Sequence, residues 1–154
     1  MEKQEIFTQV VKHLFKQGYK SEGWFNEDYS DSSGCLYRAE DGGRCAVGYF
    51  IPDDVYSVSM EGKSVSSLWD TWHDVLPAWM GDNIELLTDL QNVHDDTEVQ
   101  YDGKLFVMDE LRKGLLRVMG KHQLEWPVVY SNLDALDALQ ERLNLAHEAA
   151  TNSQ

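Results

Sequence analysis

The stretch CLYRAEDGGRCAVGYFIPDD, residues 35–54, is the least helix-like part of the chain and decides how the rest is interpreted. Residues 35–38 alternate as in a short strand, and Asp41-Gly42-Gly43 indicates a turn. Residues 44–51 fit either the return strand of a hairpin or a short helix that opens at Cys45, and Pro52 ends either one. The stretch therefore predicts a small β-hairpin or strand-turn element near residues 35–50.

The two cysteines of this stretch do not imply a disulfide. A two-residue turn would place Cys35 and Cys45 on opposite faces, because side chains alternate along a strand, whereas an odd-length loop would place them on one face. Residues 1–18 carry charges within their apolar pattern and do not read as a secretion signal. We therefore expect reduced thiols and a cytoplasmic location.

Apolar residues at three- and four-residue spacing predict helices on both sides of this stretch. The expected helices span residues 2–17, 64–76, 83–96, 105–119, and from 131 or 132 to about 149. Gly18 is placed to end the first helix, and Asp82 to cap the third with Glu85 at capping-box spacing. Residues 19–34 are expected to be a loop, and residues 126–130 an extended segment.

These elements predict a mainly α (α+β) fold of about five helices around one core. Residues 1–150 are expected to form a single globular domain, with a frayed tail at 151–154. No run of apolar residues approaches the 18 or so that a membrane span needs.

The charge is strongly negative and unevenly distributed. The 154 residues carry a net charge of −14. Twelve acids and one base, Lys63, lie between residues 46 and 103, which gives these 58 residues a net charge of −11. Such a chain is poorly suited to bind a phosphate backbone or an anionic membrane, where cations dominate affinity.

The acids of residues 83–96 are spaced so that they share one side of the predicted helix. Like charges at this spacing repel each other and cost the helix stability, which suggests a use outside the fold. Carboxylates in a row imitate phosphates and steer association with a basic surface. We therefore predict a non-enzymatic acidic protein that binds a basic surface of a host protein, such as a DNA-processing or defence protein, through Glu85, Asp89, Asp96, Asp70 and Asp74.

The alternative is a small metal- or cysteine-dependent hydrolase. Cys45 beside Arg44 could have a lowered pKa at a helix start, and with His94 and Asp95 it could form a catalytic set. His94, Asp95 and Asp96 also offer nitrogen and oxygen ligands for a metal. The cysteine and histidine spacings match no common zinc module, so the main prediction includes no metal, no cofactor and no catalytic residue.

Several short motifs together carry a resemblance. CLYR at 35–38, GRCAVG at 43–48, IPDD at 51–54, EGK at 61–63 and LQNVHD at 90–95 resemble a group of small uncharacterised phage, prophage and bacterial proteins. The similar part covers roughly residues 33–96. The resemblance implies a phage or bacterial setting and the cytoplasm of a bacterial host, and it implies no activity.

The two functional predictions differ in one structural feature. A nucleic-acid mimic exposes its acids on a convex face, whereas an enzyme gathers them with His94 in a cleft. A plainer possibility is that the acidity serves only solubility.

Overall fold

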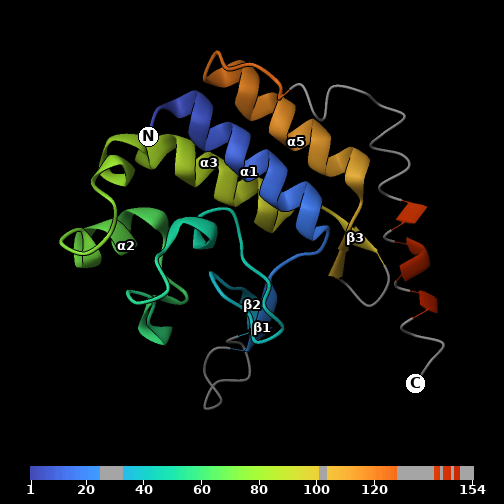
Figure 1. Cartoon of the computed structure of the whole chain (residues 1–154), viewed down its shortest axis with the longest axis horizontal. Coiled ribbons are helices and arrows are strands. Elements are labelled where there is room, and N and C mark those ends of the chain that lie inside the picture. The colour runs from blue at the N-terminus through green and yellow to red at the C-terminus, as the bar shows by residue number, and fades with distance from the viewer. Residues whose placement is uncertain (25–32, 101–103, 128–140, 143, 147, 150–154) are drawn as a thin grey trace.

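The computed structural model describes residues 1–24, 33–100, 104–127, 141–142, 144–146 and 148–149, and it has the mainly helical fold that the sequence predicts. Helices α1 (Lys3–Gln17), α3 (Ile84–Asp96) and α5 (Met108–Lys121) contact one another, and α2 (Val65–Trp72) packs against α3 (Figure 1). Two short antiparallel hairpins complete the architecture. Within these residues, no helix is long and apolar enough to cross a membrane.

Helix α1 follows its sequence pattern closely. Its inward stripe is fully buried and consists of Ile6, Phe7, Val10, Val11, Leu14 and Phe15. Each such side chain contributes about 1.5–3 kcal/mol through burial. Gly18 ends the helix as predicted, with a φ of 75° and its N–H donating to the carbonyl of Leu14.

Helix α3 lies at the centre of the fold and contacts α1, α2 and α5. Its bounds match the prediction within one residue, and Leu86, Leu87 and Leu90 on its inward side are fully buried. The predicted cap at Asp82 is wrong. A 3-10 helix, η3 (Ala78–Asn83), runs directly into α3, and Asn83 at the N-cap donates its side-chain amide to the carbonyl of Trp79.

Two other helices differ from their predicted bounds. Helix α2 ends at Trp72, and Val75, expected to face inward, is 54% exposed. The helix expected from residue 105 begins at Met108, because Leu105–Phe106 forms strand β4 and pairs with β3 (Val99–Gln100). The N–H of Phe106 also donates to the carbonyl of Gly18. These long-range hydrogen bonds use backbone groups of residues 105 and 106 that would otherwise belong to the first turn of the predicted helix.

The range expected to be a loop contains strand structure. Strand β1 (Glu22–Trp24) pairs antiparallel with β2 (Ser33–Cys35). The following turn is closed by an Arg38–Arg44 bridge, and Gly42 adopts a φ of 92° within it. After the bridge the chain enters a 3-10 helix, η1 (Gly48–Phe50), and a second one, η2 (Val58–Met60), follows. Residues 44–51 thus combine the two alternatives: Arg44 pairs with Arg38 as a return strand would, and a short helix follows, which begins at Gly48 instead of Cys45.

Gly48 makes the closest approach in this region. A Cβ atom at this position would lie 1.9 Å from the carbonyl oxygen of Tyr37. Only glycine lets the backbone pass so near another backbone segment. The crossing buries Tyr37, Ala46 and Val47, as the sequence predicts.

Part of the C-terminal prediction lies outside the described residues. Residues 141–142, 144–146 and 148–149 are helical, in agreement with the expected last helix. The rest of that helix, the tail at 151–154 and residues 102–103 lie outside the residues that the structure describes. Trp126 acts as the expected packing segment, with its ring edge-on to Phe7 and Phe15, each 6.1 Å away between centroids.

Candidate functional site

The motif residues that are scattered along the sequence meet in one place. Residues 35–37, 62–65 and one face of α3 enclose a cavity of about 290 Å³. Its polar wall includes Cys35, Lys63, Gln91 and Asp95, and the hydroxyl of Tyr37 donates to the carbonyl of Lys63. The fold thus joins the motifs at 35–38, 61–63 and 90–95.

Glu61 holds the base of this region together. Its carboxyl group is only 6% exposed and accepts three hydrogen bonds. The donors are the backbone N–H groups of Tyr37 (2.8 Å) and Arg38 (3.1 Å) and the hydroxyl of Tyr56 (2.6 Å). Burial, with Glu61 as hydrogen-bond partner, raises the pKa of Tyr56. Glu61 is therefore a structural acid, although by sequence it counts among the acids of the negative segment.

His94 is fully buried, and both of its ring nitrogens are occupied. Nε2 accepts a hydrogen bond from the backbone N–H of Ser21 at 3.0 Å, so it carries no proton. The proton of the neutral ring is therefore on Nδ1, which donates to Oδ1 of Asp95 at 2.8 Å. Neither nitrogen is free to bind a metal or to take a proton from a nucleophile.

One cluster has metal-ligand chemistry among the described residues. Ligand atoms of Cys35, His94 and Asp95 lie within 4.8 Å of one another. The cluster is already satisfied internally, because Asp95 accepts from His94, from the amide of Gln91 and from the thiol of Cys35. Burial and the neighbouring Asp95 raise the pKa of Cys35, which keeps the thiol protonated. A metal would have to break the bond between Ser21 and His94, so the residues fit a metal poorly.

Cys45 does not join this cluster as a nucleophile. Its thiol is fully buried, and burial raises its pKa to about 12 despite hydrogen bonds from the N–H of Gly48 and from Gln91. A thiol with that pKa is protonated at neutral pH and unreactive. Neither cysteine forms a disulfide in the structure. The geometry thus gives no support to a catalytic set of Cys45, His94 and Asp95.

Asp89, one of the acids expected to bind a partner, is occupied within the fold, and the exposed Glu85 lies near the same lysine. Asp89 accepts from Nζ of Lys121 at 2.9 Å and from His122 at 2.7 Å, and Glu85 lies 3.3 Å from the same lysine. Burial alone would raise the pKa of Asp89, but the hydrogen bonds and charges of Lys121 and His122 lower it. Asp89 is therefore part of the α3–α5 contact.

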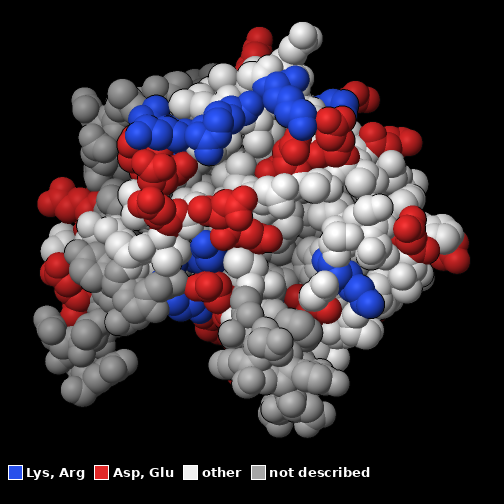
Figure 2. All heavy atoms as spheres, turned by 180° about the vertical axis from the view of Figure 1, so that it is seen from behind, with Lys and Arg blue, Asp and Glu red and all other residues white. Residues whose placement is uncertain are grey.

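The remaining predicted binding acids face solvent. Asp70, Asp74, Glu85 and Asp96 are all exposed. Asp96 lies on a groove of about 360 Å³ between α3 and α5, with Glu98, Glu110 and Arg117. Figure 2 shows this face, where a row of basic side chains from α5 borders the acids. The basic residues of α5 are Arg112, Lys113, Arg117 and Lys121, of which Arg117 and Lys121 line the groove.

Sequence reasoning missed the partners that organise this site. Cys35, Glu61 and Gln91 are central to it, yet none has a spacing that predicts the others. All three residues lie within the motifs at 35–38, 61–63 and 90–95, and these motifs were the signal in the sequence that pointed to them. No family model, curated protein or solved structure matches the chain.

Proposed function

We propose that this protein is a non-enzymatic acidic binding protein whose exposed carboxylates engage a basic surface of a host protein. The main support is a contrast between the buried groups that could do chemistry and the exposed acids. The groups suited to chemistry, His94 and Cys45, are buried and hydrogen-bonded, whereas Asp70, Asp74, Glu85 and Asp96 point to solvent. Charges at the surface act by steering and complementarity, which need no reactive group.

The amount of usable charge is smaller than the sequence suggests. Glu61, Asp89 and Asp95 belong to internal hydrogen-bond networks and do not serve a partner. The net charge of −14 still leaves a strongly negative molecule. We therefore assign the binding role to Asp70 and Asp74 at α2 and to Glu85 and Asp96 on α3, and omit Asp89.

The kind of partner follows from the charge. A basic protein surface that otherwise holds nucleic acid is complementary to exposed carboxylates, so a DNA-mimic inhibitor of a defence or DNA-processing protein is the specific form of this proposal. The resemblance to phage, prophage and bacterial proteins supports a bacterial host cell and its cytoplasm as the setting.

The experiment is affinity capture from a bacterial host lysate, followed by mass spectrometry. The wild type is compared with a variant that carries Asp70→Lys and Asp74→Lys and a second that carries Glu85→Lys and Asp96→Lys. The matched control reverses two exposed acids elsewhere, Glu40→Lys and Glu125→Lys, with the same change in net charge.

The proposal predicts a partner that the wild type and the control retain and that at least one of the other variants loses. Added duplex DNA and raised salt should both release it, because salt screens exposed charges beyond about 8 Å at physiological ionic strength. A partner that all variants retain equally, and that neither DNA nor salt releases, would falsify the mimic.

A further inference from the structure

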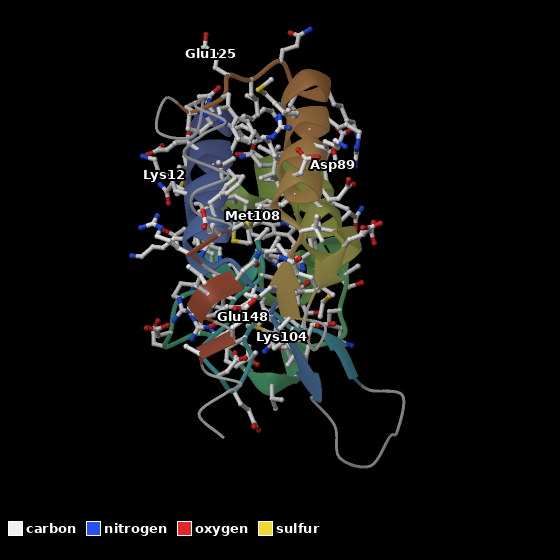
Figure 3. The ribbon with its side chains drawn as sticks, turned by 90° about the vertical axis from the view of Figure 1, so that its right-hand side faces the viewer. Lys12, Asp89, Lys104, Met108, Glu125 and Glu148 are labelled. Atoms are coloured by element: carbon white, nitrogen blue, oxygen red, sulfur yellow. The ribbon has the colours of Figure 1, made fainter. Side chains whose placement is uncertain are left out.

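A hollow on the side of the molecule away from Asp89 is lined by positively charged side chains. It has a volume of about 530 Å³ and is lined by α1 residues, by Tyr19 and by the segment after the 41–43 turn. Its cations are Lys12, Lys16 and Arg44. Figure 3 shows Lys12 extending from one side of the molecule and Asp89 from the other. The cationic hollow therefore lies on the side of the molecule away from Asp89 and the α3–α5 contact.

The wall of the hollow is fixed by hydrogen bonds. Gln17 donates to the carbonyl of Arg44 at 3.0 Å and accepts from its N–H at 2.9 Å. His13 Nε2 donates to the same carbonyl at 2.8 Å. Three hydrogen bonds thus attach the backbone of Arg44 to α1, so a ligand would meet a site that is already formed and would lose little affinity to ordering it.

The hollow also offers an aromatic surface. The rings of His13 and Tyr49 stack with centroids 4.6 Å apart and an interplanar angle of 21°. Burial lowers the pKa of His13 against the raising effect of its bond to the Arg44 carbonyl, so the ring is neutral at neutral pH. Tyr49 remains 37% exposed, which leaves part of its ring open to a flat ligand group.

Only part of this positive charge is used within the fold, since Lys16 lies in the last turn of α1, where a cation suits the helix dipole, and Arg44 is paired. Lys12 and Lys16 lie on successive turns of α1, where like charges cost stability, and within the described residues neither forms an ion pair. Arg44 shares the exposed carboxylate of Asp53 with Arg38, at 3.1 and 2.7 Å. The hollow therefore keeps an excess of positive charge in a chain of net charge −14.

We propose that this hollow binds a nucleoside phosphate, with the base against Tyr49 and the phosphate on Lys12, Lys16 and Arg44. Aromatic rings and cations together provide stacking and phosphate contacts. The volume lies in the range of small-molecule sites, about 300–1,000 Å³. A long strand is disfavoured because the whole molecule repels a polyanion, whereas a small anion in the hollow is governed by the charges within about 8 Å.

The test is isothermal titration calorimetry with adenosine diphosphate, adenosine and inorganic phosphate as separate probes. We expect saturable binding of the diphosphate, and adenosine and phosphate alone should each bind at least about tenfold more weakly, because each lacks one half of the contact. Adenosine or phosphate binding as tightly as the diphosphate, or no saturable binding of the diphosphate, would overturn the proposal.

Variants connect the signal to this hollow. Lys12→Gln with Lys16→Gln should weaken the diphosphate at least about tenfold. The matched control, Lys3→Gln with Lys113→Gln, removes the same charge from exposed sites elsewhere and should leave the affinity unchanged. Thermal melting checks that both variants fold. Equal affinity in the two variants, or tighter binding of a single-stranded oligonucleotide than of the diphosphate, would contradict the assignment.

Discussion

The helical layer and the motif region share one apolar core but differ in how far they depend on buried polar groups. Helices α1, α3 and α5 bury apolar stripes against one another, as Phe7, Leu90 and Leu115 show. Residues 35–63 contain the end of β2 and two 3-10 helices; they add apolar side chains such as Val47 and Ile51 to the same core and depend in addition on a buried carboxylate. Glu61 is that group, and His94 plays a similar part next to this region, where it accepts from the N–H of Ser21. An apolar core accepts volume-conserving apolar substitutions, whereas the carboxylate of Glu61 accepts from three donors that would be left unpaired without it.

The largest effect should come from Glu61. Glu61→Ala leaves two backbone N–H groups and the hydroxyl of Tyr56 without their acceptor, which should lower the free energy of unfolding by about 3 kcal/mol or more. Glu61→Gln should also destabilise, because its amide nitrogen would face one of three donors. Urea denaturation measures both.

The matched control is Glu40→Ala, since Glu40 is exposed, and it should change the free energy of unfolding by less than about 0.5 kcal/mol. A comparable small change in Glu61→Ala would show that the motif region does not depend on this acid.

The next effect concerns two glycines. Gly48→Ala places a Cβ 1.9 Å from the carbonyl oxygen of Tyr37, which neither backbone can avoid without moving, and should cost about 2 kcal/mol or more. Gly120→Ala, in α5 with open space around it, should instead stabilise by about 0.5–1 kcal/mol. Thermal or urea unfolding of both variants gives the comparison. Equal effects with the same sign would remove the distinction between the two regions.

A smaller effect on stability, which depends on pH, is expected in the helical layer at the contact between α3 and α5. The pKa of Asp89 is lowered in the folded protein. Its ion pair therefore adds to the free energy of unfolding above the unfolded pKa of about 3.9, and this stabilisation is lost as the pH falls through the lower folded value. Asp89→Asn should cost less than about 1 kcal/mol at neutral pH and should flatten the acid side of the stability profile.

Asp70→Asn, at an exposed position, is the control and should leave the free energy of unfolding unchanged at neutral pH. Urea denaturation at several acidic pH values makes the comparison. An acid profile of Asp89→Asn that coincides with the wild type would mean that the pair with Lys121 and His122 contributes nothing.

The same contrast explains what the sequence can predict. Helix α1 was predicted within one residue because its stripe repeats locally, and Gly18 marks its end. Leu105 was assigned to a helix because its pairing with Tyr19 joins residues 86 positions apart. Glu61 was counted as surface charge for a similar reason: its donors at Tyr37 and Arg38 meet it only after the chain has folded back. Periodicity reports burial along one element and carries no information on such distant hydrogen bonds.

The same limit on prediction from sequence applies to the candidate site, as the two cysteines and His94 show. Their residue types suggested chemistry, and the motif spacing correctly indicated a special region. The sequence carries no signal for the Ser21 N–H that occupies His94, since Ser21 lies 73 residues away. That one bond separates a structural histidine from a reactive one.

The protonation state of His94 therefore tests the account most directly. Long-range ¹H–¹⁵N correlation spectra of the native protein should show a neutral ring with the proton on Nδ1 and an unprotonated, hydrogen-bonded Nε2. Added Zn²⁺ should leave these signals unchanged, because neither nitrogen is free. A ring protonated on Nε2, or His94 signals that shift stoichiometrically with zinc, would contradict the account and favour the metal-dependent alternative.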